Sequence, residues 1–186
     1  DLGEDVVIVN RSGNHYAREV GRFTLGARTA VDVDLNALSD VVSPFKLAIV
    51  STDSGNAIRL DNNTLDQTDV TLNAGEYRIL LSDDLSGDQG LLGIRVNAGA
   101  TQLFDDVFSL GDFQRLGQIE STGSGTTPVT LSLHEFRQAL DVRIANATAV
   151  ALRLTNTAQT GSFTRAPGRY SVWGRFDADA EDDLYR

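Results

Sequence analysis

Apolar and polar residues alternate along several short segments of this chain. In residues 29–35, with the sequence TAVDVDL, aliphatic residues at every second position are separated by aspartates. Residues 128–133, with the sequence PVTLSL, repeat the pattern with Thr and Ser at the polar positions. A period of two predicts β-strands with one buried face. Other short β-rich runs are VVIVN, FKLAIV, LLGIRVN and LDVRIAN.

Turn-forming clusters such as TDSGN, DNNT, LSGDQG and STGSGTT separate these runs, and no segment keeps a period of 3.6 residues. Short strands at regular spacing are typical of antiparallel sandwiches of about 90 residues. The sequence therefore predicts an all-β protein with two tandem antiparallel β-sandwich domains of Greek-key or jelly-roll type. We place the domains at residues 1–97 and 98–186, and expect the acidic segment 177–183 to be a solvated tail.

Three motifs of the first half recur in the same order in the second half. AIRL matches ALRL 94 positions later, and TAVDVDL matches TPVTLSL 98 positions later. Gly75 and Tyr77 match Gly168 and Tyr170 at a distance of 93 positions. The drift in spacing requires insertions or deletions in loops, which surface loops tolerate well. We interpret the chain as a tandem repeat.

The recurring Gly-x-Tyr motif has a structural interpretation. Gly75 and Gly168 occupy positions where a turn favours positive φ, which glycine adopts without a Cβ clash. Tyr77 and Tyr170 can each bury a ring while the hydroxyl bonds to backbone a few residues upstream, as in the tyrosine corner of Greek-key sandwiches. We expect these four residues to stabilise the fold.

The same motifs resemble the bacterial pre-peptidase C-terminal domain, a β-sandwich appended to many secreted peptidases and other exported proteins. The family pattern closes on L-x-A-G-x-Y and an alternating strand, which corresponds to TLNAGEYRILL in the first half and RAPGRYSVWG in the second. FSLGDF, LGQI and TPVTLSL match earlier parts of the pattern. The acidic Asp-x-Asp of many members is absent from SPFKLAIV, and only Asp141 remains of it in the second half.

The resemblance implies a non-catalytic accessory module of a secreted protein. Such modules are associated with adhesion to insoluble polymers, with assistance to a neighbouring catalytic domain, or with solubility of a precursor. A chain without cysteine is compatible with bacterial export, and we expect an extracellular or periplasmic location. The chain begins at Asp1 and contains no methionine, which we interpret as the mark of a processed or trimmed product.

The net charge of −10 argues against nucleic acid as a partner. Only Lys46 is a lysine, and no Lys/Arg cluster is present to neutralise phosphates. No run approaches the roughly 20 apolar residues that a membrane helix requires. No nucleophile elbow, phosphate loop or zinc-protease motif occurs, so the sequence predicts that the chain is not an enzyme.

Calcium is the cofactor that the acidic turns could hold. Calcium takes six to eight oxygen ligands, which clustered aspartates supply. The candidates lie in SDDLSGDQG and FDDVFSLGD and are Asp83, Asp84, Asp88, Asp105 and Asp106. The alternative is that these aspartates only favour turns, because their side chains bond to nearby backbone.

Trp173 is the candidate for ligand contact. By parity its ring points away from the face that bears Tyr170, together with Arg175. A tryptophan on an outer sheet face can stack on a sugar or anchor a partner. Its equivalent in the first half is Leu80, which is also apolar, so both positions could instead be covered by a loop or by the other domain.

These features predict a pair of non-catalytic modules that bind an extracellular polymer or a protein partner. The alternative is a structural subunit of an extracellular filament or surface layer. In that case the N-terminal segment EDVVIVN could add as a strand to the sheet edge of a neighbouring copy, by self-association.

Overall fold

The computed structural model describes residues 5–10, 13–38, 45–53, 57–61, 66–83, 90–111, 113–122, 124–133, 140–155 and 157–176. Every regular element in these ranges is a β-strand, and none of them contains a helix. The predicted all-β class is confirmed.

Fifteen strands lie in the described residues. The first nine are β1 (Asp5–Asn10), β2 (Gly13–Leu25), β3 (Thr29–Ala37), β4 (Phe45–Ser51), β5 (Ala57–Asp61), β6 (Asp66–Leu72), β7 (Gly75–Asp83), β8 (Leu91–Ala98) and β9 (Thr101–Ser109). The remaining six are β10 (Gln114–Ser121), β11 (Thr127–Ser132), β12 (Leu140–Ala145), β13 (Val150–Thr155), β14 (Thr160–Arg165) and β15 (Gly168–Phe176).

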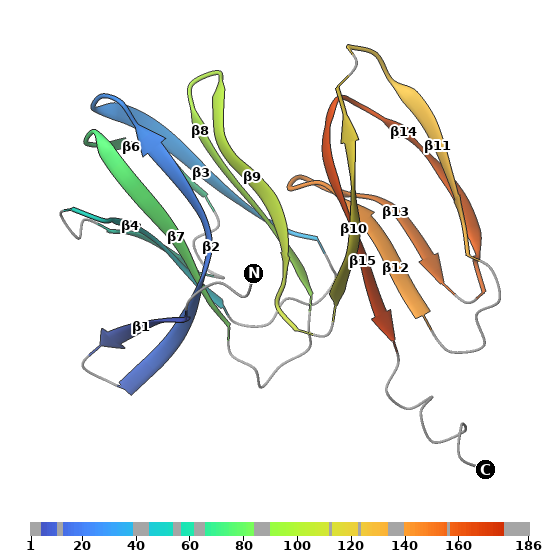
Figure 1. Cartoon of the computed structure of the whole chain (residues 1–186), viewed down its shortest axis with the longest axis horizontal. Coiled ribbons are helices and arrows are strands. Elements are labelled where there is room, and N and C mark those ends of the chain that lie inside the picture. The colour runs from blue at the N-terminus through green and yellow to red at the C-terminus, as the bar shows by residue number, and fades with distance from the viewer. Residues whose placement is uncertain are drawn as a thin grey trace.

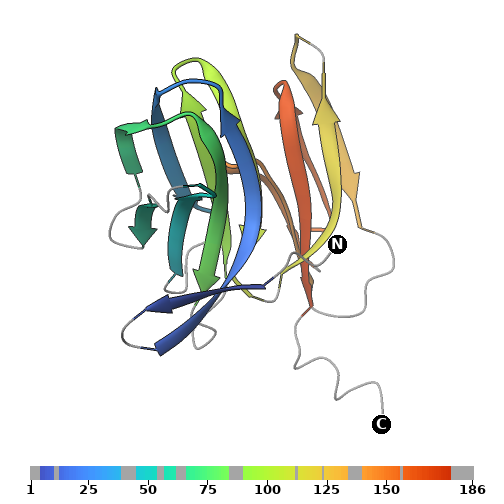
Figure 2. The same ribbon diagram turned by 60° about the vertical axis from the view of Figure 1, so that its left-hand side comes forward.

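The strands form four antiparallel sheets in two pairs (Figures 1 and 2). The N-terminal sheet pair consists of the sheet β1-β2-β7-β4-β5 and the sheet β6-β3-β8-β9. The C-terminal sheet pair consists of the sheet β10-β15-β12-β13 and the short sheet β11-β14. Within each pair, side chains of both sheets share an apolar core.

Alternation along the strands builds the N-terminal core. Val31, Val33 and Leu35 of β3 are buried, whereas the residues between them are partly exposed. They meet Ile79 and other apolar residues of the facing sheet in one cluster. The period of two in the sequence therefore predicts the buried face of β3 correctly.

The two halves share pairing registers. In the pairing of β7 with β2, and in that of β15 with β10, the strand opposite the tyrosine has a bulge directly before a glycine. That glycine is Gly21, opposite Ile79, in the first half and Gly117, opposite Val172, in the second. A bulge at the same place in both halves is the kind of specific feature that duplicated units keep.

Both corner tyrosines are buried and bond to backbone four residues upstream. The Tyr77 hydroxyl donates to the carbonyl oxygen of Asn73 at 2.9 Å. The Tyr170 hydroxyl accepts from the N–H of Ala166 at 3.2 Å. The direction of the bond differs between the halves, but each hydroxyl satisfies a backbone group at the entry to a strand, as a tyrosine corner does.

The glycines before these tyrosines have the expected positive φ. Gly75 has a φ of 148° and Gly168 a φ of 137°, a region that side chains with a Cβ rarely adopt. The chain can therefore turn into β7 and β15 at these points.

The predicted division between residues 97 and 98 falls at the end of β8, just before the turn into β9, where Ala98 lies opposite Thr101. These two strands pair along their whole length within one sheet. A boundary at this point would separate two hydrogen-bonded strands. The C-terminal sheet pair, by contrast, begins with β10.

Replacing Tyr77 or Tyr170 with Phe tests the corners. Each change removes one hydrogen bond and keeps the buried ring, so we expect the free energy of unfolding to fall by about 1 kcal/mol. Urea unfolding followed by circular dichroism measures this loss. Unchanged midpoints in both variants would show that the hydroxyls do not stabilise the turns.

Candidate functional site

An apolar cluster joins the two sheet pairs. Leu91 of β8 and Val107 of β9 contact Ala145 of β12 and Trp173 of β15, and Phe113 lies in the same cluster. In Figure 1 the strands β8 and β9 lie between the other N-terminal strands and the pair β10 and β15. The face of β15 that bears Trp173 is therefore covered by the other sheet pair.

Trp173 is only 6% exposed, so its ring is not an open stacking platform. Leu80, its equivalent in the first half, is 4% exposed. The structure thus corresponds to the second interpretation of these outer positions, in which they are covered. For Trp173 the cover is the contact between the sheet pairs, which strand parity cannot reveal.

Arg175, the third residue of the predicted ligand set, belongs to an ionic cluster around Asp141. Arg143 and Arg153 donate to the Asp141 carboxylate at 2.8 Å and 2.9 Å, and Arg175 lies 3.8 Å from it. Burial alone would raise the pKa of Asp141, but the hydrogen bonds and charges of Arg143 and Arg153 outweigh burial and lower it. Arg175 is 39% exposed and could still meet a ligand.

The same cluster links the two sheet pairs. Arg143 of the C-terminal sheet pair donates to the carbonyl oxygen of Leu38, which directly follows β3 of the N-terminal sheet pair, at 3.4 Å. The guanidinium groups of Arg143 and Arg175 lie 4.8 Å and 5.2 Å from the centre of the Phe113 ring. Cation–π contacts of this kind favour a fixed orientation of the buried guanidinium.

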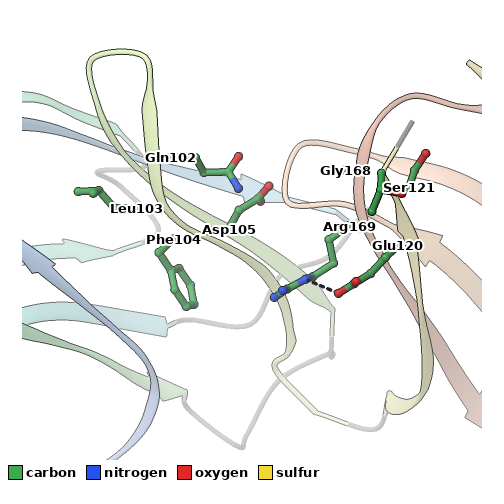
Figure 3. Close-up of a pocket in the computed structure, with 9 residues that line it drawn as sticks. Gln102, Leu103, Phe104, Asp105, Glu120, Ser121, Gly168 and Arg169 are labelled. Carbon is green, nitrogen blue, oxygen red and sulfur yellow. Dashed lines mark ion pairs between the residues drawn. The ribbon is translucent and has the colours of Figure 1, made fainter. Parts of the chain in front are cut away.

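A cleft of about 410 Å³ opens between β9 and the adjoining ends of β10 and β15 (Figure 3). Its volume lies in the range of small-ligand pockets. Its lining combines polar side chains with a few apolar ones and consists of Gln102, Leu103, Phe104, Asp105, Glu120, Ser121, Thr122, Gly168 and Arg169. The corner glycine of the second half thus contributes to the wall of the cleft.

Asp105 is the most perturbed group in this cleft. Its Oδ1 atom is buried and has no hydrogen-bond partner in the described part of the chain. Burial raises the pKa of Asp105, and the charge of Asp106 adds to this, while Arg95 and Arg169 act in the opposite direction. A carboxylate that loses water without gaining a donor destabilises the folded state.

The other polar groups of the cleft can change partners at little cost. Arg169 and Glu120 form an ion pair of 3.7 Å, drawn dashed in Figure 3, with side chains that are 51% and 61% exposed. Such exposed pairs contribute little to stability, so either group can turn to a ligand. Gln102, Ser121 and Thr122 add an amide and two hydroxyls. The cleft can therefore bind a ligand that carries several hydrogen-bond donors.

The calcium candidates have different surroundings. Asp105 lines the cleft, whereas Asp106 accepts from Arg115 at 3.3 Å and contacts Ser171 at 3.4 Å. The two adjacent aspartates therefore have different partners, and calcium binding at Asp105 and Asp106 stays a prediction. The described residues contain no group of three or more His, Cys, Asp or Glu side chains that could hold a metal ion.

The remaining calcium candidates cannot be placed in the same way. Only the backbone of Asp83 is described, at the end of β7. Asp84 and Asp88 lie outside the described residues. Calcium binding at this loop stays a prediction.

Of the residues that line the cleft, the sequence singled out Asp105 as a candidate ligand and Gly168 as a corner glycine, but none of the others. Nothing in the motifs relates Gln102 to Glu120 or Arg169, because the cleft forms only where β9 meets β10 and β15. The local signal for Asp105 was the FDDVF segment, in which a strand pattern carries two adjacent carboxylates.

Comparisons of the chain with family models, with curated proteins and with solved structures find no match. In the part of the chain that the structure describes, no helix has the length and apolar character needed to cross a membrane.

Replacing Asp141 with Asn tests the arginine cluster through pH. A carboxyl group with a lowered pKa stabilises the fold above its unfolded pKa of about 3.9, and this stabilisation is lost as the pH falls through the lower folded pKa. We expect Asp141→Asn to lower the free energy of unfolding by about 2 kcal/mol at pH 7 and by much less in acid. Urea unfolding between pH 7 and pH 2 measures the difference.

Asp53→Asn is the matched control, because it removes the same charge from an exposed residue that has no arginine partner among the described residues. A destabilisation by Asp141→Asn that is the same at every pH would contradict the assigned ion pairs.

Replacing Asp105 with Asn should stabilise the protein. A carboxyl group with a raised pKa destabilises the folded state as the pH rises through that pKa, and has no such effect below the unfolded pKa of about 3.9. We expect Asp105→Asn to raise the melting temperature at pH 7 and to leave it nearly unchanged at pH 3. Calorimetry at the two pH values measures this, and a lower melting temperature at pH 7 would show that Asp105 has a donor in the folded protein.

Proposed function

We propose that this chain is a non-catalytic pair of tandem β-sandwich modules from a secreted bacterial protein, and that it binds an extracellular polymer or a protein partner. The repeated corner geometry and the shared bulge support two units of one kind. The resemblance to pre-peptidase C-terminal domains supports an extracellular or periplasmic setting, with which the absence of cysteine is compatible.

The observation that carries the binding proposal is the unpartnered Oδ1 atom of Asp105 in the cleft. A buried carboxylate without a donor costs stability, and proteins keep such groups mainly where they serve a site. A ligand hydroxyl, amide N–H or ammonium group would supply the missing hydrogen bond. The ligand that fits best is therefore a chain that presents donors at short intervals, such as a polysaccharide or an extended peptide.

The position of the cleft and its polar lining support a polymer. The cleft is bounded by the edges of two sheet pairs, with Gly168 at one wall and Gln102 at the other. Arg169 and Glu120 are exposed beside it and offer both a donor and an acceptor to successive units of a ligand. Repeated polar contacts of this kind are individually weak, which suits a module whose avidity comes from a long ligand.

The second candidate function is a structural subunit of a filament or surface layer. It is favoured by strand edges that have no partner strand in the described residues, at β1 and at β11. Edge strands can pair with another chain and produce open assemblies. Sedimentation of the concentrated chain separates the candidates, since a filament subunit assembles whereas a binding module stays dispersed.

Retention on insoluble matrices tests the binding proposal. The chain is incubated with insoluble polysaccharides and insoluble proteins, and the bound fraction is measured against concentration. We expect saturable retention on at least one matrix and a loss of affinity of about tenfold in Asp105→Asn, the cost of one charge-assisted hydrogen bond. Because the same change should raise thermal stability, lost binding cannot be attributed to unfolding.

Arg169→Ala should weaken retention on the same matrix, whereas Asp53→Asn, outside the lining of the cleft, should not. Retention that is equal in all four proteins would place binding elsewhere, and no retention on any matrix would count against a polymer-binding module.

A further inference from the structure

The ligand cleft adjoins the outer face of a sheet. Gln102 and Asp105 of β9 line the cleft and point toward the strands that carry Ser121 and Arg169 (Figure 3). β9 is the last strand of the sheet β6-β3-β8-β9, so the face of β9 that bears these two residues continues over β8 and β3. A ligand longer than the cleft can therefore continue across this face.

Pairing registers show which side chains lie on this face. Asp105 lies opposite Arg95 of β8, and Arg95 lies opposite Asp34 of β3. Residues directly opposite each other on antiparallel strands have Cβ atoms about 4.5–5.5 Å apart on the same side of the sheet. A second row runs beside the first, and the two rows form a polar track across three strands. The second row consists of Gln102 of β9, Asn97 of β8 and Asp32 of β3.

The C-terminal sheet pair covers this face up to the row next to the polar track. In that row Asn36 lies opposite Gly93, and a Cβ atom on Gly93 would lie 2.1 Å from the carbonyl oxygen of Ala147, in the turn between β12 and β13. In the polar track, Arg95 donates to the Thr148 hydroxyl of the same turn. All six track residues are partly or fully exposed, so a ligand can reach them.

Most polar groups of the track are available to a ligand. Asp34, Asn97 and Gln102 form no hydrogen bond or ion pair with any described residue, and Asp32 accepts one bond, from the N–H of Asp69 at 2.8 Å. On the outer face of the facing sheet, by contrast, charged side chains of β2 and β7 pair with one another. These side chains are Glu19, Arg22, Glu76 and Arg78. Groups that are not already paired suit a polar ligand better, because fewer bonds are lost on binding.

The first row indicates which ligand group fits. The Oδ1 atom of Asp105 and the Nε atom of Arg95 are buried and have no hydrogen-bond partner in the described part of the chain. One is an acceptor and the other is a donor, and their residues lie opposite each other. A hydroxyl or amide group both donates and accepts, whereas an ammonium group only donates and a carboxylate only accepts. The row therefore favours a ligand with hydroxyl or amide groups.

The spacing between strands favours a polysaccharide over a peptide. Neighbouring strands lie about 4.8 Å apart, which is close to the length of one pyranose unit in an extended polysaccharide. Successive sugars can therefore meet successive strands. An extended peptide advances by about 3.3 Å per residue, so its residues do not keep step with the strands that it crosses.

The charge of the polar track favours a neutral polysaccharide. The track contains three aspartates and one arginine, and so carries an excess of negative charge. Like charges at short range repel each other, which disfavours a polysaccharide that contains uronic acids.

We propose that the polar track continues the ligand cleft and binds a neutral polysaccharide that runs from the cleft across β9, β8 and β3. This inference rests on the proposed function and specifies its ligand. One sugar lies over the track residues of β9, the next over those of β8, and the third over those of β3. The sugar hydroxyls donate to the aspartates and accept from Arg95 and the side-chain amides.

Neutral oligosaccharides of increasing length are the direct probe. Oligosaccharides of cellulose, xylan, mannan and starch, each from the disaccharide to the hexasaccharide, are titrated with the 186-residue chain by calorimetry. We expect at least one series to bind, with an affinity that rises from the disaccharide to the tetrasaccharide as sugars reach β8 and β3. Oligogalacturonates of the same lengths should not bind.

Two variants change the polar track outside the cleft. Asp34→Ala and Asn97→Ala should each weaken binding of the tetrasaccharide by about fivefold, the cost of one hydrogen bond. Asp34→Ala should leave disaccharide binding unchanged, whereas Asp105→Asn should weaken binding at every length. Asp53→Ala is the matched control for Asp34→Ala, because it removes an exposed aspartate outside the track. Thermal unfolding of each variant verifies that it is folded.

Several results would overturn this inference and leave the proposed function intact. One is that Asp105→Asn weakens binding while Asp34→Ala and Asn97→Ala do not, which would restrict the ligand to the cleft. An affinity that does not rise beyond the disaccharide leads to the same conclusion. Tighter binding of oligogalacturonates, or retention on insoluble protein without binding of any neutral oligosaccharide, would assign the cleft to another class of ligand.

Two other results would contradict the proposed function as well. They are oligosaccharide binding that none of these variants changes, and the absence of both oligosaccharide binding and retention on any insoluble matrix.

Discussion

Strand β8 is buried on both of its faces, and the rest of the structure depends on this. One face sends Leu92 and Ile94 into the N-terminal core, and the other brings Leu91 and Gly93 against the C-terminal sheet pair. At Gly93 the approach is so close that a Cβ atom would lie 2.1 Å from the carbonyl oxygen of Ala147. A strand covered on both sides needs a nearly continuous apolar run, which LLGI supplies.

This contact between the sheet pairs determines which side chains on the outer sheet faces are accessible to a ligand. It covers Trp173 with the cluster around Leu91, and it holds β9 beside β15. Asn36 strengthens the junction by donating to the Ala147 carbonyl oxygen at 2.9 Å. The cleft that Asp105 lines forms where β9 meets the ends of β10 and β15, and so depends on how the two sheet pairs meet.

The two halves also show how equivalent sequences acquire different roles. Tyr77 and Tyr170 keep the same corner, and the bulges before Gly21 and Gly117 keep the same register. Around these shared elements the described strands have different neighbours: β3 pairs with β6 and β8, whereas β11 pairs with β14. The two halves thus share local geometry, whereas the surroundings of each half determine its surface.

The sequence by itself determined the features that arise within a strand or a turn. The alternation in residues 29–35 predicted the buried face of β3, and the Gly-x-Tyr motif predicted a turn with positive φ and a hydroxyl bonded to nearby backbone. These predictions succeed because side-chain parity and glycine conformation depend on neighbouring residues only. The matched motifs also indicated corresponding strands in the two halves.

Only the tertiary structure decided how these strands meet. It paired β8 with β9 across the predicted boundary at residue 97 and covered Trp173. It paired Asp106 with Arg115 and left the Oδ1 atom of Asp105 without a hydrogen-bond partner among the described residues. Each of these outcomes joins residues that are distant in sequence or belong to different sheets. Periodicity within one strand carries no information on which outer face another sheet will cover, because that choice depends on the packing of the whole chain.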